Sequence, residues 1–193
     1  MYEGGAFLFW KCGGFIMKSK AAVRKLVLSG MFLALALVLP FLTGQIPEIG
    51  SMLLPMHLPV LIAGFVCGAP YAAAIGFIAP FLRFVLFGMP PVFPTGTSMA
   101  IEMCVYGLVC GLMYRIFPKR NAYVYAALVV SMIAGRIAWG IAQYFFLMIN
   151  GGALTVKAFM AGAVLNAWPG IVLQLVLVPV IVIALKKANL IKD

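Results

Sequence analysis

Charged residues are scarce in this chain of 193 residues: only 9% are Asp, Glu, Lys or Arg, and only 4 are acidic. Soluble domains carry roughly 25% charged residues, which cover their water-facing surface. The scarcity of charge therefore excludes a soluble globular domain. Apolar residues make up 65% of the chain, and the mean hydropathy is +1.15. We expect an integral membrane protein.

Motifs for catalysis and for metal or nucleotide binding are also missing. The 4 cysteines form no CxxC pair, and a single histidine offers no zinc spacing. No Walker A, HExxH or GxSxG motif occurs, so the chain is not predicted to hydrolyse ATP itself. Its basic residues lie at the ends of apolar runs without interleaved aromatics, which argues against nucleic-acid binding despite a net charge of +10. We expect no cofactor and no enzymatic activity.

Apolar runs of membrane-spanning length fill most of the sequence, separated by short polar or Pro/Gly-rich connections. They predict a six-helix bundle with helices at 26–42, 53–66, 71–87, 98–116, 122–149 and 156–185. Three prolines exclude a helix from the connection at 88–95. Residues 1–16 are Gly-rich and precede a second methionine, Met17, so we interpret them as a disordered tail or upstream extension. Residues 17–193 then form one all-α membrane domain.

Basic residues fall on one side of this predicted bundle. Lys157 alone lies on the other side, whereas the first side carries Lys18, Lys20, Arg24, Lys25, Arg115, Lys119, Arg120, Lys186, Lys187 and Lys192. Cytoplasmic loops are enriched in Lys and Arg. The pattern predicts that both termini are cytoplasmic, and an even number of spans gives the same result.

Three charged residues lie inside the predicted spans: Arg83, Glu102 and Arg136. Such residues are expensive in lipid and normally face the bundle interior or a wet cavity. Arg83 and Glu102 are each about five residues from the external ends of helices joined by the proline-rich connection. We therefore predict an Arg83–Glu102 ion pair, with Arg136 deeper in the membrane.

Further polar and aromatic residues are predicted in the same outer half of the bundle, and together with the three charges they make up the candidate substrate site: His57, Gln143, Tyr144, Asn166 and Trp168. A polar cluster on one side indicates a binding cavity open to the outside, because a channel needs polar residues along its full length. The intramembrane charges sum to +1, which favours a small organic anion as substrate.

Each of these residues also has a structural explanation. Arg83 could snorkel to the outer interface, and Glu102 could neutralise an arginine for packing alone. His57 could be an interfacial residue without a ligand, and Trp168 could belong to an aromatic belt.

The first predicted helix has small residues four apart, Gly30 and Ala34. Small-xxx-small spacing lets a second helix approach closely. The pair predicts a docking face for a partner subunit. Alternatively, it packs against the smooth face formed by Ala72 to Gly76 of the same chain.

The chain resembles the substrate-binding S components of energy-coupling factor (ECF) vitamin transporters. The resemblance covers roughly 18–187 and rests on the Gly30-xxx-Ala34 spacing, the segment LLPMHLPVLIAGF at 53–65, the turn GAPY at 68–71 and the loop GMPP at 88–91. It implies a bundle in a bacterial cell membrane that captures a vitamin from outside. The implied partners are a membrane scaffold subunit and two cytoplasmic ATPases. Within the family the arrangement looks most like the pantothenate-type members.

Two other functions remain open from the sequence. One is a stand-alone secondary transporter or channel for a small organic solute, and the other is a small membrane enzyme. Tight binding of a vitamin by the isolated chain would distinguish the S component from both.

Overall fold

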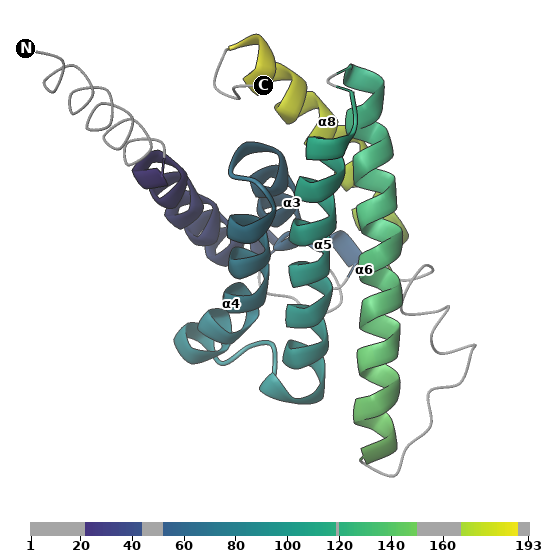
Figure 1. The fold of residues 1–193 in the computed structure, drawn as a ribbon. Coiled ribbons are helices and arrows are strands. Elements are labelled where there is room, and N and C mark those ends of the chain that lie inside the picture. Colours follow the sequence, from purple (N-terminus) through teal and green to yellow (C-terminus); the bar gives the residue numbers. More distant parts are fainter. Residues whose placement is uncertain (1–21, 44–51, 119, 150–166, 189–193) are drawn as a thin grey trace, which may run out of the picture.

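The computed structural model describes residues 22–43, 52–118, 120–149 and 167–188, and its regular elements there are all helical (Figure 1). An N-terminal helix at 22–38 continues into a short 3-10 turn, η1 (Leu39–Thr43). The remaining elements are α3 (His57–Val66), α4 (Ala69–Phe87), the turn η2 (Val92–Gly96), α5 (Thr97–Ile116), α6 (Asn121–Ile149) and α8 (Trp168–Lys187). Five of the helices are long and apolar enough to cross a membrane, and α3 is a shorter apolar helix. The predicted all-α membrane class is confirmed.

The predicted helix boundaries agree with the structure except at two connections and in the last span. The second predicted helix, 53–66, begins only at His57, because Leu54 has a φ of 49° and Pro55 lies in a turn. The prediction of no helix over 88–95 holds for 88–91, but 92–96 forms one wide turn, interrupted by an extended Phe93. The last predicted helix, 156–185, is described from Trp168 onward, and 150–166 lies outside the described residues.

The central seam of the bundle is the contact between α4 and α5, where small residues bring two backbones together. A Cβ on Gly107 would lie 2.8 Å from the backbone nitrogen of Ala73, and Gly111 packs equally closely against Ala69. Gly76, at the other end of the seam, lies against the backbone of Met103. The smooth face of α4 is therefore occupied by α5. The close approach fixes α5 as the central helix, with α3 and α6 packed against it.

The N-terminal helix contacts the rest of the bundle along a narrow stripe. Its buried residues are Ser29, Phe32, Ala36 and Pro40, at the three- and four-residue intervals of one helix face. Gly30 and Ala34 lie outside this stripe and are exposed, and a Cβ on Gly30 would meet nothing within 4 Å. The alternative in which they pack on Ala72 to Gly76 is therefore wrong.

The helix ends that carry basic residues gather at one end of the bundle. The last turns of α5 and α8 contain Arg115, Lys186 and Lys187. The end of α5, the beginning of α6 and the end of α8 lie together at the top of Figure 1, and the connection from α4 to α5 lies at the opposite end. This arrangement is the one that a positive-inside topology requires.

Candidate functional site

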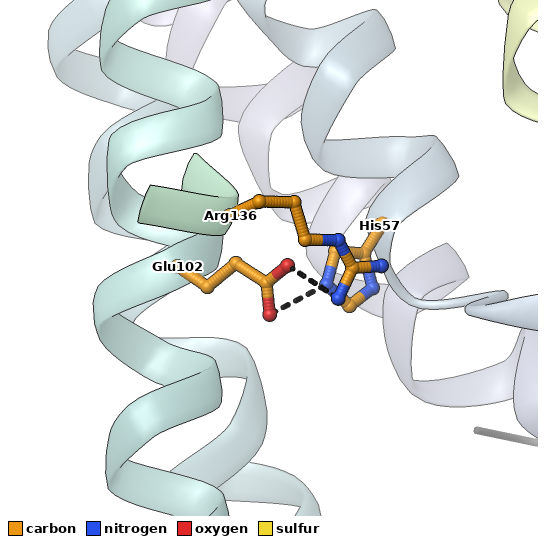
Figure 2. A network of polar contacts seen from close by, with 3 residues as sticks. All are labelled: His57, Glu102 and Arg136. Carbon is orange, nitrogen blue, oxygen red and sulfur yellow. Dashed lines mark ion pairs between the residues drawn. The ribbon is translucent and has the colours of Figure 1, made fainter. Parts of the chain in front are cut away.

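Three helices bring ionisable side chains together in the interior (Figure 2). Glu102 of α5 is 2% exposed, and its Oε1 lies 3.1 Å from Nη1 of Arg136 on α6. Its second oxygen, Oε2, lies 3.6 Å from Nε2 of His57, the first residue of α3. A carboxylate shared between an arginine and a histidine from different helices is expensive to assemble in lipid and is typical of a functional site.

Local structure places each member of this group. The turn before α3 closes with a backbone hydrogen bond from His57 to Leu54 of 3.1 Å, and it turns the imidazole into the core. Tyr106 follows Glu102 by one helical turn, and its ring meets the ring of His57 edge-on at 5.4 Å. Gly135, directly before Arg136, provides the space that the Tyr106 ring occupies.

Several buried polar atoms have no hydrogen-bond partner within the described part of the chain, and all but those of Gln174 belong to the residues around Glu102. They are both ring nitrogens of His57, Oε1 of Glu102, the Tyr106 hydroxyl, Nε and Nη2 of Arg136, and both amide atoms of Gln174. The contacts of Glu102 with His57 and Arg136 are thus charge contacts without hydrogen-bond alignment. Because buried polar groups are nearly always hydrogen-bonded, such a concentration of unpartnered atoms indicates a place prepared for a polar ligand.

Arg83 is separate from this group, and the predicted Arg83–Glu102 ion pair is wrong. The Arg83 guanidinium donates from Nη1 to the backbone carbonyl of Leu37 at 2.9 Å. It also lies 5.6 Å from the ring centres of Phe41 and Phe87. Arg83 therefore contacts the N-terminal helix rather than Glu102, and it ties α4 to that helix. The structure also gives no indication that Arg83 snorkels, since it is only 6% exposed.

Gln143, Tyr144 and Trp168 lie outside the central group. The Ser98 hydroxyl has two acceptors within reach, Oε1 of Gln143 at 2.7 Å and the Pro94 carbonyl at 2.8 Å, so Gln143 of α6 contacts the start of α5 beside the proline-rich connection. Tyr144 and Trp168 are 47% and 59% exposed, as residues facing lipid or its interface would be. Asn166 lies outside the described residues.

Two residues of the region were missed at the level of sequence: Tyr106 and Gln174. Both could have been singled out from the sequence as polar residues within predicted spans. Tyr106 lies one helical turn after an intramembrane glutamate, and Gln174 is a lone amide within the apolar span 168–185. Within the described ranges, no group of three or more His, Cys, Asp or Glu side chains could hold a metal ion.

Comparison with known proteins identifies the family. The family model of the ECF transporter substrate-specific component matches residues 24–182. This chain belongs to that family. S components are membrane subunits of transporters rather than enzymes, and they bind a small substrate and associate with ECF scaffold and ATPase modules. No curated protein and no solved structure matches the chain. Its function as a multi-pass, substrate-binding transport subunit therefore rests on the family and on the apolar helices.

Proposed function

We propose that this S component captures a small organic anion from outside the cell, with pantothenate as the leading candidate, and delivers it to an ATP-driven ECF importer. Its binding site is the group formed by His57, Glu102, Tyr106 and Arg136. In this proposal the protein lies in a bacterial plasma membrane with both termini cytoplasmic, as the gathering of basic helix ends supports.

The proposal rests on the edge of the Arg136 guanidinium that does not face Glu102. Nη1 faces Glu102, whereas Nε and Nη2 are buried and unpartnered. Nε and Nη2 present two parallel N–H donors, the fork that a carboxylate or phosphate accepts with both of its oxygens. An anion bound there would satisfy both donors at once. A neutral alcohol would satisfy at most one.

The position of Glu102 supports the same assignment. A lone guanidinium in the membrane interior is strongly unfavourable, and a carboxylate 3.1 Å away offsets that penalty. Because Glu102 occupies one end of the guanidinium, the fork is held open for a second anion. Glu102 then positions Arg136 rather than competing with the substrate.

The described polar residues do not form a path through the bundle. The site side chains lie around the start of α3, and the core beyond it along α3 and α5 is apolar: Val60, Leu61, Ala63, Phe65 and Cys110. A channel would need polar residues along its whole length. The arrangement therefore favours a capture subunit over a channel.

The test compares pantothenate with pantothenol, in which an alcohol replaces the carboxylate, by titration of the purified chain in detergent. Arg136→Lys keeps the charge but loses the fork. We expect it to weaken pantothenate binding by about 1.5–3 kcal/mol, roughly 10- to 150-fold, and to leave pantothenol binding nearly unchanged. Arg115→Lys is the matched control, because Arg115 is exposed in the last turn of α5.

Equal affinity of the wild-type chain for the two compounds would contradict the anion assignment. So would normal pantothenate binding by Arg136→Lys in a folded preparation. A screen of other vitamins by thermal shift on the same preparation would then identify the substrate class directly.

A further inference from the structure

Gln174 is buried in α8 without a hydrogen-bond partner. It is 0% exposed, and neither its Nε2 nor its Oε1 is satisfied within the described residues. Val178 and Val182 follow on the same face, one and two turns further along, and both are fully buried. Packing alone would favour an apolar residue at this position, because an unsatisfied buried amide is destabilising.

Two contacts show that α8 runs parallel to α3. Near the start of α8, Gly170 lies on the backbone of Met52 and Leu53, the residues just before α3. At the other end, Tyr114 of α5 meets both the Phe65 ring from α3 at 5.1 Å and the Lys186 ammonium from α8 at 5.2 Å. The two helices therefore start together and end together.

This register places Gln174 beside the proposed site. Gln174 follows Gly170 by four residues, about 6 Å along a helix axis. His57 follows Leu53 by four residues, through the turn that starts α3. Gln174 and His57 thus each follow the same contact by four residues, on helices that pack against each other. By this count Gln174 lies at about the level of His57 in the bundle.

We infer that Gln174 is a substrate-recognition residue and that it binds an amide group of the ligand. The inference rests on the proposed substrate site. A carboxamide has an acceptor, Oε1, and a donor, Nε2, and the N–H of a trans secondary amide of the ligand can donate to Oε1. A carboxylate accepts only and would leave Oε1 of Gln174 unpaired. With a carboxylate on the Arg136 fork, the substrate class is a small carboxylic acid that also carries an amide.

The test uses three probes on the purified full-length chain: pantothenate, pantothenol, and the pantothenate analogue in which CH₂ replaces the amide N–H. We expect the wild-type chain to bind the CH₂ analogue about 10- to 100-fold more weakly than pantothenate, because Oε1 of Gln174 loses its donor. Gln174→Leu should bind pantothenate more weakly by a similar factor and should no longer discriminate between the two compounds.

A thermal-unfolding measurement without ligand separates recognition from packing. Gln174→Leu should leave the Tm unchanged or raise it, since it replaces an unsatisfied amide with an apolar group of similar size. A lower Tm with unchanged discrimination would assign Gln174 a packing role and overturn the inference.

The probes also separate this inference from the proposed function. If the wild-type chain binds pantothenate and pantothenol equally but rejects the CH₂ analogue, the carboxylate assignment fails and the recognition role of Gln174 is supported. If it binds pantothenate and the CH₂ analogue equally, the role of Gln174 fails and the anion site stands. Failure of the wild-type chain to bind either amide-bearing probe would overturn the role of Gln174.

Discussion

Gly135 links the packing of the bundle to the geometry of the proposed site. A Cβ at this position would overlap Cδ1 and Cε1 of the Tyr106 ring and would lie 3.1 Å from its Cγ. Carbon atoms in contact are normally about 3.5–4.0 Å apart. Tyr106 is 0% exposed, and its ring meets that of His57, so a shift of the ring would disturb its contact with His57. Gly135→Ala must therefore shift either α6 or the ring.

The size of the effect follows from two opposing contributions. Overpacking a core destabilises it by about 1–3 kcal/mol, and the ring overlap places this case at the upper end. Alanine is favoured over glycine inside a helix by about 1 kcal/mol. We expect a net destabilisation of about 2 kcal/mol for Gly135→Ala, or roughly 4–8 °C in Tm. Gly30→Ala is the matched control, because nothing lies within 4 Å of its Cβ position, and its Tm should not fall.

A double-mutant cycle identifies the cause. Tyr106→Leu removes the ring, so adding Gly135→Ala to that background should stabilise the chain by about 1 kcal/mol, which corresponds to a coupling of about 3 kcal/mol. Pantothenate affinity should fall in Gly135→Ala as well, because the displaced ring moves toward His57. Differential scanning fluorimetry and binding titration on one preparation provide both measurements. An equal Tm drop with and without the Tyr106 ring would refute the reasoning.

Three further predictions concern parts of the bundle outside the central group. Arg83→Ala should lower the Tm but change ligand affinity by less than about threefold, because its guanidinium serves a backbone carbonyl of the N-terminal helix; a large affinity loss at unchanged Tm would contradict this. Gly30→Leu combined with Ala34→Leu should abolish co-purification with the scaffold subunit while ligand binding persists, and loss of both would count against a docking face. Ser98→Ala should speed substrate release, measured by stopped-flow dissociation, because it removes the hydroxyl that has Gln143 of α6 and the Pro94 carbonyl within hydrogen-bond distance; an unchanged off-rate would show that this hydroxyl has only a structural role.

Much of the fold could be read from the residue pattern because lipid imposes a simple constraint. Apolar runs long enough to span a bilayer must be helical, and Pro and Gly end them at recognisable points. Pro70 starts α4, and Gly88, with a φ of 72°, ends it, as the sequence indicates. The boundary at His57 could not be read in this way, since it depends on a positive φ at Leu54, a residue that rarely adopts one.

The sequence also determined which residues are out of place in a membrane, but not which of them meet. Counting along a helix gives the depth of a side chain, and on depth alone Arg83 and Glu102 are matched. Only the packing decides which way each faces. The glycines of the α4–α5 seam set how these two helices pack, and in that packing Arg83 reaches the Leu37 carbonyl of the N-terminal helix while Glu102 faces His57 and Arg136. An ion pair forms only when two side chains lie within a few ångströms of each other in space. The sequence specifies the position of each side chain along its helix, but not the direction in which it points.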